Sequence, residues 1–279
     1  MATVTVSPDN LSVTVSGTQP IGTATGALRG SYPAPYVDAE AYNRRGYVLF
    51  SDFPGLSAPW SIVTAQSATS AFTYTYSDET INYVRLSVAN SIAGSRAWIS
   101  DRYTLFQQPT ILAGNAEMIL SARVRFNRNG DARTTARVGF LQGHRDPIQQ
   151  TYGDNNSNGI YFYCFNGNNW KACSVLNYEP QEEPPTGDGE EVDTGVSSSD
   201  WRVLKVTVNA AGTECKFYVD AVLKLTVTDP AHIPKVGNVI ASQTDWMHAA
   251  ALIRADNVGA TASPTFDIDW MHFEYRVAR

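Results

Sequence analysis

Cysteine is scarce in this sequence, and three residues in 279 cannot form the disulfide framework of a small secreted domain. There is no Cys-x-x-Cys motif, and no group of cysteines and histidines has the spacing of a zinc site. Cys164 and Cys173 flank residues 165–172, which have the pattern of a β-hairpin. A disulfide across that hairpin is one interpretation, and a pair of buried free thiols is the one that we favour.

Charge is scarce as well, because only 17% of the residues are Asp, Glu, Lys or Arg. The net charge of −6 is unevenly distributed: seven acidic and no basic residues lie between Tyr178 and Ser199. The rest of the chain is therefore close to neutral and lacks the clustered Lys and Arg that nucleic-acid binders carry. We expect no nucleic-acid partner.

Long apolar segments are also missing. No run of about 18 apolar residues occurs, and no basic N-terminus precedes an apolar stretch. We therefore expect neither a membrane span nor a signal peptide.

What the sequence does contain is the pattern of antiparallel β-structure, clearest over residues 201–227. Three runs rich in Val, Leu, Tyr and Phe are separated by two short turns. Gly212 lies in the first turn, where glycine takes positive φ without a steric penalty. Asp220 and Ala221 form the second, which is short enough to join two hairpin strands.

The same alternation continues through much of the chain, without a convincing 3.6-residue period. The turn signals between the runs predict an all-β protein, a two-sheet sandwich or jelly roll. Further strands are predicted at residues 48–52, 72–76, 83–88, 96–99, 117–126, 134–142, 159–165, 170–175, 239–241, 246–254 and 265–277.

Residues 1–45 have a different composition from residues 46–279, and we divide the chain there. Residues 3–7 and 11–16 alternate Val with Thr and Ser, which predicts two short strands around a turn. Residues 17–35 are dense in Gly, Thr, Ala and Pro and cannot form a core alone. We interpret residues 1–45 as an extended segment for attachment or oligomerisation and residues 46–279 as the main domain.

Residues 178–200 combine the seven acids with three prolines and look too polar and too broken to pack. We expect a solvated, mobile insertion here. A loop organised by Ca²⁺ is the alternative, because oxygen-rich loops suit that ion, although the EF-hand spacing is absent. No other cofactor or metal is expected.

Catalytic motifs are absent too. Retaining glycoside hydrolases need two nearby carboxyl groups, and the Glu-x-Asp-x-x-Glu run of such enzymes does not occur. Asp267 and Asp269 share one face of a predicted strand, but without a third carboxylate they are better interpreted as structural. A polysaccharide lyase would need a set such as Arg137, Tyr161, Tyr163 and His248 on neighbouring strands. We favour a protein that is not an enzyme and catalyses nothing.

Sugar binding requires less: aromatic faces for stacking and planar polar groups for hydrogen bonds to hydroxyls. Period-two reading of four strands places arginines and aromatic rings opposite the apolar positions, and we expect them on one sheet. The alternative is that the arginines only solvate an outer face and the rings complete the core. The candidate carbohydrate-binding residues are Arg123, Arg125, Arg137, Tyr161, Tyr163, Trp170, Trp246 and His248.

Three parts of the main domain resemble the concanavalin A-like lectin and glucanase family. They are the opening segment 48–60, the hairpins at 201–227, in which the second strand ends in Tyr-Val-Asp, and the closing strand 265–277. The resemblance implies a concanavalin A-like jelly roll over residues 46–279.

Residues 26–37 resemble a short element of bacteriophage fibre and structural proteins, in which Gly, Leu and Gly precede Tyr-Pro-x-Pro-x-Val. The resemblance implies a virion protein, either a head or tail fibre, a spike or a capsid decoration, assembled in the host cytoplasm. It also implies other virion proteins as partners and a homo-oligomer, often a trimer. The attachment residues would be Leu28, Tyr32, Pro33, Pro35 and Val37.

These observations leave three functions open. The first is a virion protein whose lectin-like domain binds host-surface glycans. The second is a glycoside hydrolase or lyase that degrades a polysaccharide. The third is a capsid cement that binds no sugar.

Overall fold

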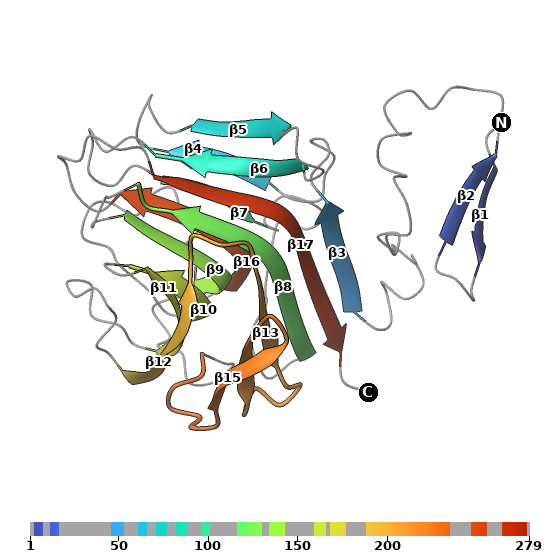
Figure 1. Ribbon diagram of the computed structural model, residues 1–279. Helices are drawn as coiled ribbons and strands as arrows, with labels where there is room; N and C mark the ends of the chain where they lie inside the picture. The colour runs from blue at the N-terminus through green and yellow to red at the C-terminus, as the bar shows by residue number, and fades with distance from the viewer. Residues whose placement is uncertain are drawn as a thin grey trace.

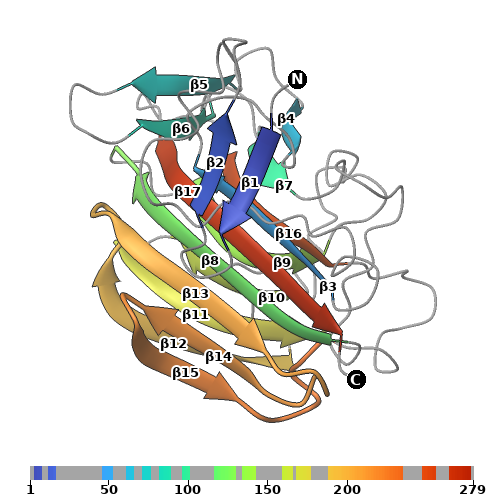
Figure 2. The same ribbon diagram turned by 90° about the vertical axis from the view of Figure 1, so that its right-hand side faces the viewer.

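The computed structural model describes residues 3–7, 12–16, 46–52, 61–65, 71–76, 82–88, 96–100, 116–129, 134–142, 159–165, 168–176, 188–234, 247–255 and 264–277. All regular structure within these ranges is β-strand, arranged in two large antiparallel sheets and one separate hairpin (Figures 1 and 2). No helix in the described part is long and apolar enough to cross a membrane. The all-β jelly-roll sandwich predicted from the sequence is confirmed.

Some consecutive strands are neighbours in one sheet, as β9 to β12 are, and others cross from one sheet to the other, as β7 to β8 do. The seven-strand sheet has, in spatial order, β12 (Asp188–Ser197), β11 (Asn169–Leu176), β10 (Gly159–Cys164), β9 (Thr134–Gln142), β16 (Met247–Ala255), β7 (Arg96–Ser100) and β4 (Ser61–Ala65).

The eight-strand sheet is built around two long strands that lie side by side (Figure 1). Its order is β15 (Val222–Val227), β14 (Cys215–Val219), β13 (Arg202–Val208), β8 (Ala116–Asn127), β17 (Thr265–Val277), β6 (Asn82–Ser87) and β5 (Ala71–Tyr76). The eighth strand, β3 (Gly46–Asp52), pairs with the second half of β17.

The core lies between the two sheets, and period-two alternation puts one face of each strand into it. On β8 every second residue is buried, from Ala116 through Val124 to Phe126. Aromatic rings meet edge to face across the core, as Phe126 does with Phe266 at 6.2 Å between centroids. The largest buried side chain, Trp170, lies 6.1 Å from the ring of Phe266. Alternation read from the sequence therefore identified the inward faces of β8, β9 and β16 correctly.

The hairpin turns match their sequence signals. Gly212 has φ of 63°, as predicted for the first turn. Asp220 and Ala221 have φ of 49° and 66°, so the two residues between β14 and β15 both adopt the left-handed conformation of a type I′ turn. The carboxylate of Asp220 accepts a hydrogen bond from the backbone N–H of Val203 at 2.9 Å, which ties this turn to β13.

The prediction that residues 178–200 form a mobile insertion is wrong for the second half of the segment. Strand β12 occupies Asp188–Ser197 and pairs with β11. Its alternate residues Val192 and Val196 pack on the core, and the hydroxyl of Thr194 is buried and donates to the carbonyl of Trp170 at 2.6 Å. Glu191 and Asp193, at the alternate positions, are exposed, so composition hid a strand that the spacing of Val192, Thr194 and Val196 indicates.

The predictions for the cysteines and for the remaining strands have different outcomes. Cys164, Cys173 and Cys215 are all buried free thiols, as favoured, and the first two lie on opposite faces of their strands. Strand β4 was not predicted. The N-terminal hairpin was: β1 (Thr3–Ser7) pairs with β2 (Ser12–Ser16). The strand predicted at 239–241 and the rest of the predicted attachment segment lie outside the described residues.

Candidate functional site

The predicted carbohydrate-binding residues are divided between two sheets rather than gathered on one. Arg123 and Arg125 lie on the outer face of the eight-strand sheet, on β8. Arg137, Tyr161 and Tyr163 lie on the outer face of the seven-strand sheet, on β9 and β10. Alternation predicts which face of a strand points outward, but the sheet to which a strand belongs depends on long-range pairing. The expectation of a single sheet is therefore wrong.

On the seven-strand sheet, the strands of the postulated lyase set are indeed neighbours, in the order β10, β9, β16. Tyr163 is the register partner of Arg137, and the ring centroids of Tyr161 and Tyr163 lie 6.2 Å apart, edge to face. The guanidinium of Arg137 lies 5.6 Å from the centre of the Tyr161 ring. His248 pairs in register with Leu141, but its side chain is outside the described part.

These tyrosines are inaccessible in this structure. Tyr161 and Tyr163 are 1% and 2% exposed, and together with Cys173 and Val175 they form a second apolar cluster on the outer side of the sheet. The Tyr163 hydroxyl donates to Glu191, and burial followed by this bond raises its pKa far above the usual value for tyrosine. A tyrosine with a raised pKa stays protonated at neutral pH and is a poor general base.

The remaining predicted site residues are placed as follows. Trp170 lies between the sheets with no exposed surface, so its indole offers no face to a ligand. Trp246 and the predicted attachment residues Leu28, Tyr32, Pro33, Pro35 and Val37 lie outside the described residues.

The outer face of the eight-strand sheet carries a second group of charged and aromatic side chains, which we call the arginine cluster. Arg85 and Tyr83 extend from β6, Arg123 and Arg125 from β8, and Trp201 from the start of β13. Asp267 and Asp269 of β17 complete it. The sequence singled out Arg123 and Arg125 as binding candidates and Asp267 and Asp269 as structural residues. The alternation of Tyr83 with Arg85 on β6 is the signal that sequence reasoning missed.

Asp267 organises the centre of the cluster. Its side chain is 1% exposed and accepts hydrogen bonds from Arg85 through Nε at 2.7 Å and Nη2 at 3.0 Å. Arg125 donates to the same carboxylate through Nη2 at 2.8 Å and Nε at 3.2 Å. Register explains the meeting, because Arg85 and Arg125 are both cross-strand partners of Asp267, one on each side. The interpretation of Asp267 as a structural aspartate is therefore confirmed.

A β-bulge brings in the second carboxylate. The register of β17 with β8 shifts between Ile268 and Trp270, so that Asp269 is the extra residue. Arg123 Nη1 donates to Asp269 Oδ2 at 2.6 Å. Burial raises the pKa of Asp269 above its usual value, and Arg123 partly opposes that effect.

Two aromatic rings hold the guanidinium groups from the side. Arg125 lies 4.8 Å and Arg123 5.3 Å from the centre of the Trp201 ring, and Arg85 lies 5.3 Å from that of Tyr83. The two rings touch edge to face at 5.6 Å. Each arginine–aromatic contact at a half-exposed site contributes about 0.5–1 kcal/mol, and together they restrict the side-chain rotamers of the arginines.

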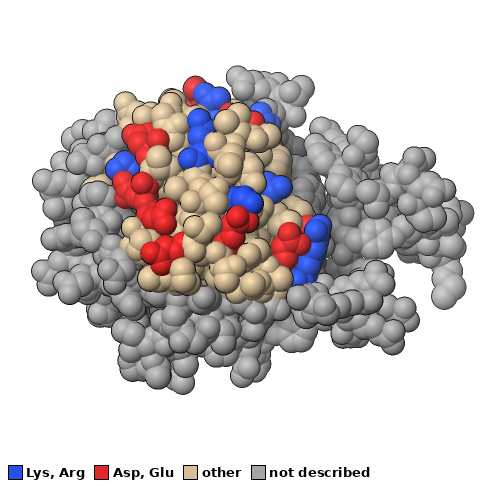
Figure 3. Space-filling model, turned by 90° about the horizontal axis from the view of Figure 1, so that it is seen from below, with Lys and Arg blue, Asp and Glu red and all other residues tan. Residues whose placement is uncertain are grey.

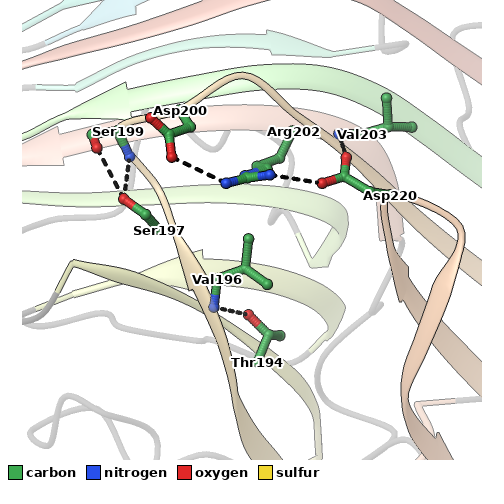
Figure 4. Close-up of polar contacts among 8 residues, drawn as sticks. All are labelled: Thr194, Val196, Ser197, Ser199, Asp200, Arg202, Val203 and Asp220. Atoms are coloured by element: carbon green, nitrogen blue, oxygen red, sulfur yellow. Dashed lines mark hydrogen bonds and ion pairs between the residues drawn. The ribbon is translucent and has the colours of Figure 1, made fainter.

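The segment carrying Trp201 is itself fixed by hydrogen bonds, drawn in Figure 4. Arg202 donates to Asp200 at 3.0 Å and to Asp220 at 3.1 Å, and Asp220 in turn accepts from the N–H of Val203. The backbone N–H of Asp220 donates to the carbonyl of Val203 at 2.8 Å. These bonds fix the backbone at the start of β13 and so set the position of the Trp201 indole.

The cluster is partly open to solvent. The side chains of Arg85, Arg123 and Arg125 are 31%, 31% and 29% exposed, while the Asp267 carboxylate below them is covered. Three guanidinium groups and two carboxylates leave one excess positive charge. The described residues on the face seen in Figure 3 carry charges of both signs, with several acidic groups gathered toward one side. No group of three or more potential metal ligands occurs among the described residues.

Comparison with known proteins shows the fold. The sequence matches no family model and no curated protein. A solved protein of unknown function from Shewanella oneidensis superposes with a TM-score of 0.56 at 12% identity, covering 84% of this chain and 89% of that one.

Two further solved structures with the jelly-roll fold give lower scores. The β-glucanase of Bacillus licheniformis has a TM-score of 0.49 at 12% identity, over 83% of this chain and 98% of its own. The carbohydrate recognition domain of Emp46p, in its potassium-bound form, has a TM-score of 0.47 at 10% identity, over 77% and 87%.

Proposed function

We propose that the chain is a glycan-binding protein without catalytic activity, displayed on a bacteriophage particle, and that the arginine cluster is its binding surface. The observation that carries the binding function is the combination of exposed guanidinium N–H groups with the ring of Trp201 on one rigid sheet face. Aromatic rings stack on the CH faces of pyranoses, and planar donors bond their oxygens.

The restricted arginine side chains of the cluster support a binding function for this surface. Each arginine is held on one side by an aspartate and on another by a ring, so few rotamers are lost when a ligand arrives. Avoiding that ordering cost preserves about 0.5–1.5 kcal/mol for each immobilised side chain.

The same geometry weighs against acid–base catalysis at the cluster. A retaining or inverting glycosidase needs one carboxyl group that carries a proton and a second that faces the sugar. Asp267 is held between two guanidinium groups and is covered, so it reaches no substrate. Asp269 bonds Arg123, and its side chain is only 10% exposed.

Attachment to a particle is supported by the sequence alone. Residues 26–37 resemble the fibre and decoration element of phage proteins, and two prolines favour an extended shape there. We propose that residues 1–45 bind other virion proteins or sister chains, with a trimer as the assembly. Several weak sites on one particle then give strong adhesion through multivalency. Antibody against the full chain should decorate purified particles in electron micrographs; a protein found only free in the medium would contradict this part.

The binding function is tested by screening the full chain against a glycan panel and comparing two variants. Arg123→Lys keeps the charge opposite Asp269 but loses the planar group beside Trp201, and we expect binding to fall about tenfold. Arg276→Lys is the control, because Arg276 also bonds two acidic side chains, Glu274 and Glu117, and lies outside the cluster. Equal binding by both variants would reject the cluster as the site, and no binding by the parent chain would reject the function.

A further inference from the structure

The hydrogen-bonding capacity of the cluster is unbalanced. Asp267 accepts four hydrogen bonds from Arg85 and Arg125, one at Oδ1 and three at Oδ2. Its side chain is also 1% exposed and therefore unavailable to a ligand. The groups that reach solvent are consequently N–H donors, and a ligand matching them must be rich in acceptors.

The orientation of the guanidinium planes indicates which kind of acceptor the ligand carries. Arg85 and Arg125 both turn their Nε–Nη2 edge toward Asp267. Because a guanidinium is planar, the edge formed by Nη1 and Nη2 then points in another direction. Nη2 of Arg85 also donates to the Tyr83 hydroxyl at 3.1 Å, so this edge of Arg85 is already partly used. For Arg125, no hydrogen bond among the described residues engages Nη1. An Nη1–Nη2 edge is the fork that binds a carboxylate through two parallel bonds.

The net charge of the cluster also favours a negatively charged ligand. The cluster carries one excess positive charge, and Lys205 on β13 adds another on the same outer face, where it lies 5.7 Å from the ring of Tyr218. Arg123 offers further donors beyond its single bond to Asp269. A ligand group with one negative charge would neutralise the excess of the cluster itself without disturbing the internal ion pairs, whereas a neutral sugar would leave it.

Resting on the glycan-binding function proposed above, we infer that the arginine cluster is a subsite for a carboxylate, and that it takes a uronic-acid residue of an acidic glycan. The Nη1–Nη2 edge of Arg125 binds the carboxylate, and the ring of Trp201 borders the pyranose. Asp267 is a positioning residue that orients the guanidinium groups of Arg125 and Arg85.

The test uses the full chain and calorimetric titration with oligosaccharides of galacturonate, glucuronate and mannuronate. Each is compared with its own methyl ester, which keeps the sugar ring and removes the charge. We expect at least one acid form to bind, its ester to bind at least about tenfold more weakly, and added salt to weaken the acid form selectively. Arg125→Lys should lose about tenfold for the acid and little for the ester, whereas Arg276→Lys, outside the cluster, should change neither.

The outcomes separate the two proposals. If acid and ester bind equally, or neutral oligosaccharides bind while no uronate does, the carboxylate subsite is overturned and the glycan-binding function survives. If sulfated oligosaccharides bind as tightly as the uronates, the site recognises anions in general, which also overturns it. If no oligosaccharide binds, both proposals fall. Thermal unfolding of each variant checks that it is folded.

Discussion

At the scale of single residues, the arginine cluster depends on one carboxylate. Asp267→Asn keeps the size of the side chain but leaves the guanidinium groups of Arg85 and Arg125 facing a neutral amide. Removing one partner of a fully buried ion pair costs about 3–5 kcal/mol. The two arginines are about a third exposed, so water compensates part of the loss, and we expect about 2–3 kcal/mol.

Urea denaturation of the parent and the variant measures this cost. Asp200→Asn is the control, because the Asp200 carboxylate also bonds an arginine but is 61% exposed. Its loss should cost less than about 0.5 kcal/mol. Equal costs for the two substitutions would contradict the assignment of Asp267 as the organising residue.

The lowered pKa of His272 predicts how the free energy of unfolding depends on pH. This residue lies on the outer face of β17, and burial lowers its pKa below the usual 6.5, with Glu274 opposing and Arg276 and Lys205 adding to the effect. The unfolded chain therefore binds this proton more readily than the folded one. The contribution to stability is complete above pH 6.5 and is lost as pH falls through the lowered pKa.

Unfolding free energies measured between pH 7.5 and 5.5 test this sign. The parent chain should lose stability toward the acid end, and His272→Gln should have a flatter profile over the same interval. A steeper profile for the variant would show that the imidazolium is stabilised rather than penalised in the folded protein.

At the scale of elements, the acidic strand β12 is the clearest case. Val192 packs on the core although its neighbours in sequence are charged. Val192→Ala should cost about 1–2 kcal/mol through lost apolar contact. Val222→Ala on the edge strand β15 removes the same atoms from a residue that is 58% exposed, and should cost less than about 0.5 kcal/mol.

Guanidinium chloride unfolding of both valine variants measures the difference. If Val192→Ala proves as mild as Val222→Ala, the acidic segment contributes nothing to the fold and the sequence-based expectation of a solvated insertion regains its force.

Elements differ in how far the sequence specifies them. Hairpins such as β13–β14–β15 were predictable because Gly212, Asp220 and Ala221 mark their turns and the strands alternate locally. The membership of β8 and β9 in different sheets was not, because pairing of β8 with β17 joins residues about 150 apart in the chain. Strand β12 escaped because its outward acids dominate its composition. The arginine cluster was half predicted, since Arg123 and Arg125 were visible but their partner on β6 was not.

At the scale of the whole molecule, the thiols report on global opening. Burial raises the pKa of Cys215 to about 12 and also raises those of Cys164 and Cys173, so none is a ready nucleophile. In the folded chain at pH 8 we expect no thiol to react with a disulfide reagent within minutes, and three to react in denaturant. Rapid labelling of any one in the folded chain would contradict its burial.

The account as a whole holds that the sandwich binds an acidic glycan on the face of its eight-strand sheet and does not cleave it. The most direct measurement incubates the full chain with the uronate oligosaccharides and follows binding and new reducing ends or unsaturated products in one sample. The account predicts saturable binding, weakened by Arg125→Lys, with chain length of the oligosaccharide unchanged after prolonged incubation. Shortened oligosaccharides that appear with the parent chain would contradict it.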